Sequence, residues 1–373
     1  MRSVAETRRG RPTMNDVAAT AGVALKTVSR VVNNEPGVNA ATAERVRQAI
    51  ELLGYRRNDG ARVLRRGRTA SIGLIIEDVA DPFYSGLSRA VEDVALRNGS
   101  LVFTGSSGED PQRERALVLA FCARRVDGLV IVPAGYDHGY LAPELAAGIR
   151  AVFADRPPGP AVEVDTVLCD NEGGARTGVA HLIAHGHRRI AFLGDQPAIF
   201  TAQERLRGYR EALEAAGLPY DPALVSMGVP EQTRVTAALA GALALDHPPT
   251  ALFTGNGQLT VAVLRALATL FAAPSGLHRD VTHPGEGRHS GGQHGGGQHG
   301  GGTPRPAIVG FDDFQLADLL TPAITVVAQD PIGLGRTAAE LLFRRLAGEN
   351  GPVERIRLPT RLISRGSGEL PPP

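Results

Sequence analysis

Residues 13–33 read TMNDVAATAGVALKTVSRVVN, and this stretch decides the fold of the N-terminal part of the chain. Apolar side chains recur at helical spacing at positions 14, 17, 18 and 21, and Thr13 stands where a helix N-cap is expected. Gly22 then interrupts the pattern, and a second short amphipathic run over residues 25–32 turns Val28, Val31 and Val32 inward. Two short helices joined in this way predict a helix-turn-helix.

The second of these helices predicts contact with DNA. Its outward positions carry Leu25, Lys26, Ser29 and Arg30. In a major groove, Lys and Arg side chains can read guanine edges, and a serine hydroxyl can hold phosphate. The alternative that the residues leave open is a pair of ordinary surface helices joined by a glycine turn.

Charge is distributed unevenly along the chain and favours DNA binding. Residues 1–70 hold 14 basic and 6 acidic side chains, whereas residues 71–373 hold 26 basic and 33 acidic ones. The net charge of the whole chain, +1, hides this contrast. A basic segment followed by an acidic body is typical of a DNA-binding domain joined to a domain of another kind.

The N-terminal segment resembles the headpiece of the lactose/galactose repressor family of bacterial transcription factors. The resemblance continues through VNNEPGVNAATAERVRQAIELLGYRRN, with a third helix over about residues 40–53, and then through ARVLRRGRTASIGLII, and it covers almost all of the chain. It implies a three-helix headpiece over residues 13–57. In this headpiece bases would be read by Leu25, Lys26 and Arg30, and phosphates would be held by Thr13, Thr27, Ser29 and Asn33. Ala24 stands where many members have a serine N-cap, whose loss typically costs about 1 kcal/mol.

Two flanking segments extend the expected DNA contact. Residues 58–68 resemble the family's hinge helix, and the resemblance implies that Leu64 wedges into the minor groove, with Ala61 one turn before it. Gly60 and the absence of a starting proline weaken this helix, so we expect it to be disordered away from DNA; a basic linker is the alternative. Residues 1–12 contain RRGRP, and we expect a disordered basic arm, either inserted in a minor groove or simply solvated.

The rest of the chain, residues 71–366, alternates short β-branched runs with helical patterns. Buried strands are predicted at 71–78, 99–107, 126–134, 149–157, 188–196, 250–257 and 306–313, and helices at 86–97, 112–124, 173–185 and 204–216. The alternation predicts an α/β fold with parallel sheets, and its length suffices for two lobes. The resemblance implies the periplasmic-binding-protein arrangement: an N-lobe of about residues 71–169 and 331–358, and a C-lobe of about 170–328 and 359–365. Ligands of such folds bind between the lobes, beyond the carboxyl ends of the strands.

Seven residues match effector-binding positions of the family: Asp81, Phe83, Tyr84, Asp170, Arg205, Asn256 and Asp312. Asp81 opens an Asp-Pro-Phe-Tyr motif whose rings offer faces for stacking on a sugar or a base. Arg205 stands where many members give a bidentate hydrogen bond to ligand hydroxyls or a carboxylate. Glycine follows Asn256 where many members have aspartate, so ligand specificity cannot be transferred from a relative. For each of these side chains, a helix cap or a buried ion pair is the alternative.

Residues 273–306 form a His/Gly-rich insertion. It holds half of the ten histidines, namely His278, His283, His289, His294 and His299. Apolar side chains are nearly lacking, so we expect a disordered surface loop. A flexible segment loses entropy on closing around a metal ion and lacks the outer hydrogen bonds that orient metal ligands. We therefore predict no metal site and no cofactor.

These patterns predict a regulator rather than an enzyme. The sequence shows no HExxH, GxSxG, Walker A or Cys-rich zinc pattern, and no GxGxxG that opens a βαβ unit. We find no signal peptide and no apolar run near the length of a membrane span, and the two cysteines suit a reducing compartment. We therefore expect a cytoplasmic bacterial protein that joins the nucleoid when it binds its operator.

The expected function is control of transcription. We expect a homodimer on a pseudo-palindromic operator in double-stranded DNA, because one helix-turn-helix reads only a half-site. We expect a repressor whose operator affinity is set by a small molecule, a sugar or related metabolite, bound between the lobes. The alternative is an architectural or constitutive DNA-binding protein with a vestigial cleft.

Overall fold

The computed structural model describes residues 11–56, 68–271 and 305–373. The chain divides into two compact units, residues 1–69 and residues 70–373, which are described separately. The expected hinge helix with Ala61 and Leu64, almost all of the expected arm and almost all of the His/Gly-rich insertion lie outside the described residues.

The first unit is a three-helix domain. Its helices are α1 (Met14–Ala21), α2 (Leu25–Val32) and α3 (Ala40–Leu53). Thr13 caps α1 in a capping box, in which its backbone N–H donates to Asp16 Oδ2 at 2.8 Å and its hydroxyl accepts from the Asp16 N–H. Ala24 begins α2 without a side-chain cap, as the sequence predicts.

A small apolar core holds these three helices together. Val17, Val28 and Val46 contribute one side chain from each helix, and all three are fully buried. Val31 and Val32, which we expected to point inward, are only half-buried at the edge of this core. The helix-turn-helix predicted from the spacing of the apolar residues is therefore present, with Val28 as the main anchor of α2.

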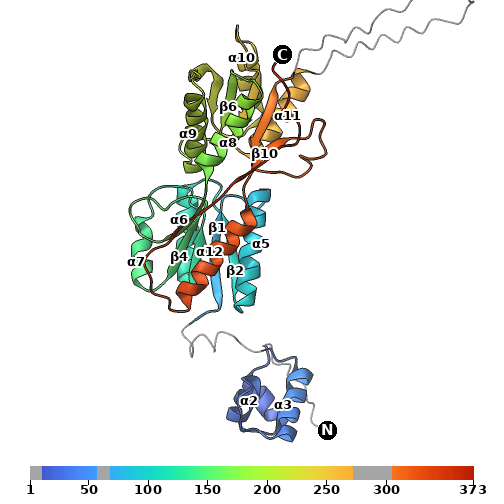
Figure 1. Ribbon diagram of the computed structural model, residues 1–373. Coiled ribbons are helices and arrows are strands. Elements are labelled where there is room, and N and C mark those ends of the chain that lie inside the picture. Colours follow the sequence, from blue (N-terminus) through green and yellow to red (C-terminus); the bar gives the residue numbers. More distant parts are fainter. Residues whose placement is uncertain (1–10, 57–67, 272–304) are drawn as a thin grey trace, which may run out of the picture. The chain divides into compact units, whose positions relative to one another are not determined.

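The second unit contains two lobes, each built on a six-stranded sheet (Figure 1). The N-lobe sheet has the order β11-β5-β4-β3-β1-β2, and all of its neighbouring strands are parallel. Its strands are β1 (Ser71–Ile76), β2 (Leu101–Ser106), β3 (Gly128–Ile131), β4 (Arg150–Ala154), β5 (Asp165–Cys169) and β11 (Arg355–Leu358). One face packs on α5 (Pro82–Arg97) and α12 (Pro331–Leu346), and the other packs on α6 (Pro111–Ala123) and α7 (Ala142–Ala146). The strands are apolar on both sides because helices cover both faces.

The C-lobe sheet has the order β12-β10-β9-β8-β6-β7 and is parallel except for β12, which runs antiparallel to β10. Its strands are β6 (Ile190–Gly194), β7 (Val225–Met227), β8 (Ala251–Thr254), β9 (Ala307–Phe311), β10 (Thr325–Ala328) and β12 (Arg361–Ile363). One face packs on α8 (Asn171–Ala184) and α9 (Phe200–Ala215), and the other on α10 (Gln232–Leu243) and α11 (Gly257–Leu270).

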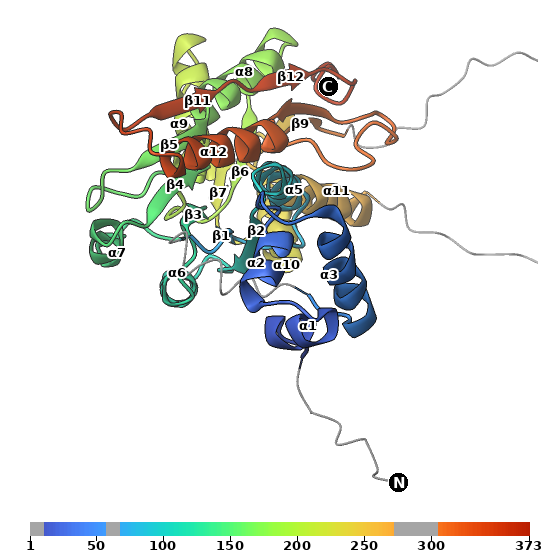
Figure 2. The same cartoon turned by 90° about the horizontal axis from the view of Figure 1, so that it is seen from below.

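The chain passes between the lobes three times. The passages follow β5, β10 and β11, and the last one links β11 to β12 in one extended course (Figure 2). The chain beyond residue 366, where we expected the domain to end, still packs on the C-lobe: His181 Nε2 lies 2.5 Å from Glu369 Oε1, and His187 Nε2 lies 2.8 Å from the Leu370 carbonyl. Three short connections between two rigid lobes suit a cleft that can open and close.

The structure contains five strands that were not predicted, namely β5, β7, β10, β11 and β12, and it shifts the ends of the predicted elements. The helices α5 and α9 begin earlier than predicted, at Pro82 and Phe200, whereas each predicted strand is shorter than its apolar run. Both cysteines, Cys122 and Cys169, are buried and free. None of the helices within the described ranges is long and apolar enough to cross a membrane.

Candidate functional site

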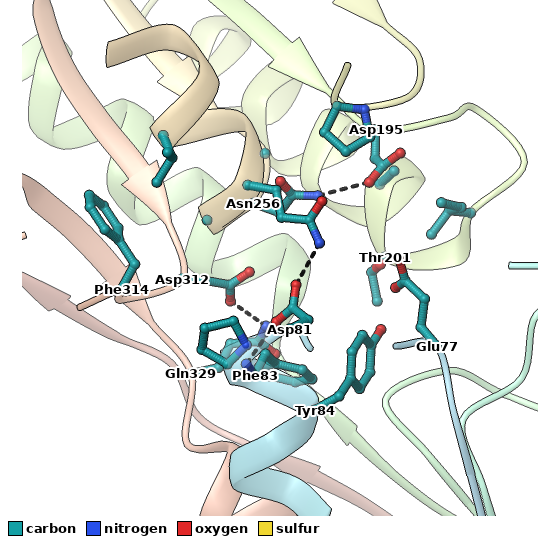
Figure 3. Close-up of a pocket in the computed structure, with 18 of the residues that line it drawn as sticks. Glu77, Asp81, Phe83, Tyr84, Asp195, Thr201, Asn256, Asp312, Phe314 and Gln329 are labelled. Atoms are coloured by element: carbon teal, nitrogen blue, oxygen red, sulfur yellow. Dashed lines mark hydrogen bonds between the residues drawn. The ribbon is translucent and has the colours of Figure 1, made fainter. Parts of the chain in front are cut away.

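A cavity of about 440 Å³ lies between the N-lobe and the C-lobe (Figure 3). Much of its wall is formed by the first residues after parallel strands: Glu77 after β1, Asp155 and Arg156 after β4, Asp195 after β6, Gly255 and Asn256 after β8, Asp312 after β9, and Gln329 after β10. The cleft therefore lies at the carboxyl edges of both sheets, as expected for this architecture.

Arg205 organises the C-lobe wall. Its Nε donates to Asn171 Oδ1 at 2.9 Å, and its Nη1 donates to the Gly255 carbonyl at 2.6 Å. The guanidinium also lies 4.0 Å from the centroid of the Phe311 ring, and Nη1 lies 3.6 Å from Asp312 Oδ2. Cation–π contact and an ion pair together fix the position of a charge that is almost fully buried.

Asp312 is held in an unusual conformation beside this arginine. Its φ is +69°, and its Oδ1 accepts a hydrogen bond of 2.6 Å from Gln329 Nε2. Burial raises the pKa of Asp312, although the charge of Arg205 opposes the shift. Left-handed backbone at a non-glycine residue costs of order 1 kcal/mol or more, and such strain is found preferentially at binding sites.

Asn256 and Asp195 form a second polar group on the C-lobe wall. Asn256 Oδ1 accepts from the Leu259 N–H and so caps α11, while its Nδ2 donates to Asp195 Oδ2 at 2.8 Å. Figure 3 shows these two side chains together on one side of the pocket. Burial raises the pKa of Asp195.

The N-lobe wall is built around a second buried arginine, Arg156. Its Nη1 and Nη2 donate to both carboxylate oxygens of Glu109 at 2.7 and 2.6 Å, and Nη2 also donates to the Tyr84 hydroxyl at 3.2 Å. Glu77 lies 3.5 Å from the same Nη2. Burial and the neighbouring Glu109 raise the pKa of Glu77 to about 8.

Asp155 completes this wall and is also strained. Its φ is +67°, it is 3% exposed, and its Oδ2 lies 3.5 Å from Arg156 Nε. Its Oδ1 has no hydrogen-bond partner among the described residues. Burial raises the pKa of Asp155, with Arg156 and Arg205 acting in the opposite direction.

Unpartnered buried polar atoms are concentrated in this cavity. Within the described residues, five buried side-chain atoms lack a hydrogen-bond partner: Ser88 Oγ, Asp155 Oδ1, Arg156 Nε, Gln232 Oε1 and Gln329 Oε1. All except Ser88 belong to residues that line the cavity, and three of those four atoms are hydrogen-bond acceptors. The two glutamine amides are oriented by their own donors, which bond to the Ala262 carbonyl and to Asp312. Since buried polar groups normally have partners, these four atoms leave the hydrogen bonding of the cavity wall incomplete.

One hydrogen bond joins the two lobes across the cleft. Gln258 Nε2 of α11 donates to Asp81 Oδ2 at 2.7 Å, while Asp81 Oδ1 accepts from the Phe83 N–H and caps α5. In this structure the cleft is therefore bridged at the position where the sequence places the Asp-Pro-Phe-Tyr motif.

Six of the seven residues expected to bind effector line this cavity: Asp81, Phe83, Tyr84, Arg205, Asn256 and Asp312. Asp170 is not among the lining residues. Its carboxylate caps α8 by accepting from the Gly173 N–H at 3.2 Å, and it lies 3.6 Å from Arg357 Nη1. The side chain is used locally because it immediately precedes the helix, so we do not retain Asp170 in the candidate site.

Sequence reasoning missed several lining residues. These are Glu77, Asp155, Arg156, Asp195, Gln258 and Gln329. The first four are polar side chains at the ends of the predicted strands 71–78, 149–157 and 188–196. The observed strands end just before them, and the residues after parallel strands are where such a fold places its binding residues. That signal was available in the sequence. In the part of the chain that the structure describes, no group of three His, Cys, Asp or Glu side chains is arranged to hold a metal ion.

The candidate DNA-binding residues lie on the first unit. Leu25, at 46% exposure, and Lys26 are exposed on α2, and the remaining α2 positions, Thr27, Ser29 and Arg30, are half-buried. Asn33 Nδ2 donates to Ser29 Oγ at 3.2 Å, which places two of the expected phosphate contacts together. An exposed leucine beside a lysine is unusual on a solvent face and suits contact with a base edge.

Comparison with known families agrees with both units. Residues 13–58 match the model described as bacterial regulatory proteins, lacI family, and residues 69–272 match periplasmic binding proteins and sugar binding domain of LacI family. Residues 305–368 match a periplasmic binding protein-like domain. The interval between the last two matches contains nearly all of the expected insertion.

Individual relatives span nearly the whole chain. The transcriptional regulator CelR of Thermobifida fusca is 35% identical over 97% of this chain and 99% of its own length, and GalR of Escherichia coli K12 is 29% identical over 92% and 91%. A solved CelR–cellobiose complex covers 96% of this chain and all of its own, with a TM-score of 0.65 and 32% identity. The lac repressor dimer bound to operator and an anti-inducer covers 96% and 99%, with a TM-score of 0.78 and 25% identity. The chain therefore belongs to the LacI family of bacterial regulatory proteins, whose members regulate transcription rather than catalyse reactions.

Proposed function

We propose that this regulator is a repressor that binds a pseudo-palindromic operator as a homodimer and changes its operator affinity when a small molecule occupies the cleft. The observation that carries the effector part is the set of unpartnered acceptors around the cavity, Asp155 Oδ1, Gln232 Oε1 and Gln329 Oε1. A hydroxyl-rich ligand supplies the missing donors, and a sugar is such a ligand. The relative CelR was solved with cellobiose, which agrees with this chemistry.

For the operator, we propose the roles that the family resemblance implies. Leu25, Lys26 and Arg30 read bases from α2, while phosphates are held by Thr13, Thr27, Ser29 and Asn33. The hinge positions Ala61 and Leu64 contact the minor groove at the operator centre. A wedge at that point kinks the duplex at a cost of a few kcal/mol per unstacked step.

For the dimer, support comes from the edge of the N-lobe sheet. β2 is an edge strand, and its Leu101 and Phe103 are 68% and 43% exposed. An open edge strand with exposed apolar side chains favours association and is normally covered. The lac repressor, which is similar over nearly the whole chain, was solved as a dimer on its operator.

The cleft argues against a purely architectural protein. A vestigial cleft would have no reason to keep two buried arginines, two strained aspartates and several acceptors without partners at one place. Such groups are costly to bury, so their retention favours a ligand that uses them.

The test has two parts. A binding site is first selected from a random DNA library with the purified protein, and its affinity is then measured by fluorescence anisotropy with and without a panel of sugars. We expect one member of the panel to change operator affinity at least fivefold. A protein that binds its selected site tightly and ignores every compound that binds the cleft would support the architectural alternative instead.

A matched pair of variants tests the base-reading role. Arg30→Ala should lose about 1 to 3 kcal/mol of binding free energy and relax preference at one base pair in each half-site. Arg47→Ala on α3, an exposed arginine paired with Glu44, is the control and should leave the preference unchanged. Equal base preferences for the wild type and Arg30→Ala would refute the assignment.

A further inference from the structure

The cleft contains more acid than base. Its lining residues include six acids, Glu77, Asp81, Asp155, Asp195, Asp312 and Asp313, and three arginines, Arg156, Arg205 and Arg265. Two of the arginines are already engaged, since Arg205 pairs with Asp312 and Arg156 makes a bidentate pair with Glu109. Asp313 is likewise paired with Arg365, which lies outside the cavity. Arg156 also lies 3.5 Å from Glu77 and from Asp155, so Asp81 and Asp195 are the lining acids that have no salt bridge among the described residues.

Asp155 is the lining acid that most clearly lacks a hydrogen-bond donor. It is 3% exposed and lines the cavity, yet its Oδ1 has no partner among the described residues. Its other oxygen lies 3.5 Å from Arg156 Nε, whose two terminal nitrogens are committed to Glu109. A carboxylate in this position is stabilised by a cationic hydrogen-bond donor more than by a neutral one.

Asp195 adds negative charge from the opposite wall. It follows β6 in the C-lobe, and none of the salt bridges among the described residues includes it. Glu109 of the N-lobe raises the pKa of Asp195 through its negative charge, and Arg156 lowers it through its positive charge, so charges of the two walls lie within range of each other. Like charges on facing walls repel, and a cation between the walls would remove this repulsion.

We propose that the effector carries a positively charged amine, as an amino sugar does, with Asp155 as its hydrogen-bond partner and Asp195 as a further negative charge near it. This inference rests on the proposed function, because it specifies the chemistry of the effector in the same cleft. A metal ion fits less well, since the described residues contain no grouping of ligands that would hold one.

Binding of such a cation favours closure of the cleft. The amine is attracted to acids on both walls, so its binding free energy is greatest when the walls are close together. The acceptor atoms of Gln232 and Gln329 remain available for the hydroxyl groups of the same ligand. The amine thus adds affinity and discrimination to a site that also recognises hydroxyls.

The experiment compares sugars that differ only at nitrogen. Glucose, glucosamine and N-acetylglucosamine form one series, and cellobiose with the corresponding disaccharides of glucosamine and N-acetylglucosamine forms the other. Calorimetric titration of the full chain at pH 7 and low ionic strength should show at least tenfold tighter binding of the amine than of its hydroxyl parent in one series. Acetylation removes the positive charge and should abolish that advantage.

Variants assign the effect to the acids. Asp155→Asn should lower the affinity for the amine at least tenfold and change the affinity for the neutral parent by less than threefold. Asp93→Asn, an exposed aspartate on the outer side of α5, is the matched control and should change neither. Asp155 is buried, so its substitution could also disturb the fold. Asp195→Asn therefore provides a second measurement, made without ligand. Its Tm should exceed that of the wild type, because repulsion between the walls is relieved.

The outcomes separate this inference from the proposed function. If a neutral sugar binds as tightly as its amine or more tightly, and changes operator affinity, the inference is overturned and the proposed function stands. A Tm of Asp195→Asn at or below that of the wild type also contradicts the inference. If no compound in either series binds or alters operator affinity, both the inference and the effector part of the proposed function are rejected.

Discussion

At the scale of single residues, Glu77 links the cleft to pH. Burial and the neighbouring Glu109 raise its pKa from an ordinary 4.5 to about 8. Between pH 5 and 8 the folded chain therefore keeps a proton that the unfolded chain has released. The free energy of unfolding must fall as pH rises through this window, by an amount on the order of a few kcal/mol for one such group.

Replacing that carboxyl group should remove the pH dependence. Thermal melts of Glu77→Gln in the absence of ligand should give a Tm that changes less between pH 5.5 and 8 than the Tm of the wild type. Glu92→Gln removes an exposed carboxylate from α5 and is the control, which should keep the slope of the wild type. A wild-type Tm that rises over this interval would show that Glu77 is ionised in the folded chain.

Other residues of the cleft show how much of the candidate site could be predicted from the sequence. Arg205 and Asp312 were found because the resemblance supplied their roles, and they do lie together. Asp155 and Asp195 were missed because the predicted strands 149–157 and 188–196 include them, whereas β4 and β6 end one residue before them. Asp170 was expected in the site because its position matches a family motif, but its carboxylate caps the first turn of α8.

At the scale of elements, two helix glycines lie in different environments, and only one of them is needed for helix packing. A Cβ on Gly335 of α12 would overlap the Leu87 carbonyl of α5, so these helices approach each other too closely for any side chain at this point. Gly241 of α10 has no atom within 4 Å of the same hypothetical Cβ. The first glycine is required by contact, whereas the second only adds entropy to the unfolded chain.

Substitution by alanine should therefore act in opposite directions. Gly335→Ala should lower the free energy of unfolding by about 1 to 3 kcal/mol, as in other overpacked cores. Gly241→Ala should raise it by about 0.5 to 1 kcal/mol, because alanine is the better helix former. Scanning calorimetry of both variants beside the wild type checks the signs, and equal shifts would mean that α5 and α12 can separate freely.

Helices and strands were predicted well where the alternation of apolar and polar residues extends over several repeats. The third headpiece helix was expected over residues 40–53, and α3 has those bounds because Asn39 caps one end and Gly54 takes a left-handed conformation at the other. The strands β5, β7, β10, β11 and β12 have three to five residues each and were not predicted. Such short runs rarely show a clear alternation, and their pairing is decided by strands far away in the sequence.

At the scale of the whole molecule, association through the N-lobe edge makes a direct prediction. Leu101→Arg places a charge on the exposed edge of β2, and a buried unpaired charge in an interface is strongly unfavourable. Sedimentation at micromolar concentration should show dimers for the wild type and mainly monomers for this variant, with weaker operator binding. Val353→Arg, an exposed apolar position beside β11, is the control. A monomeric wild type with undiminished operator affinity would exclude the dimer.

The remaining prediction concerns the coupling between cleft and operator. Arg205 lies in the C-lobe wall, and Asp81 and Tyr84 lie in the N-lobe wall, so a ligand that contacts both walls favours one angle between the lobes. If that angle controls the headpieces, ligand and operator affect each other's affinity by the same factor, typically about 5 to 150-fold. Arg205→Ala should reduce the ligand effect to below twofold while operator affinity without ligand stays within threefold of the wild type.

Two controls make the coupling test decisive. Arg210→Ala, on the same helix but exposed and stacked on Tyr220, should keep the full ligand effect. Arg205→Lys keeps a positive charge beside Asp312 but cannot reproduce the planar fork, so it should also weaken the response while preserving the fold. The reciprocal measurement is ligand affinity with operator present and absent. If ligand changes operator affinity in Arg205→Ala as much as in the wild type, the site that controls DNA binding is not this cleft.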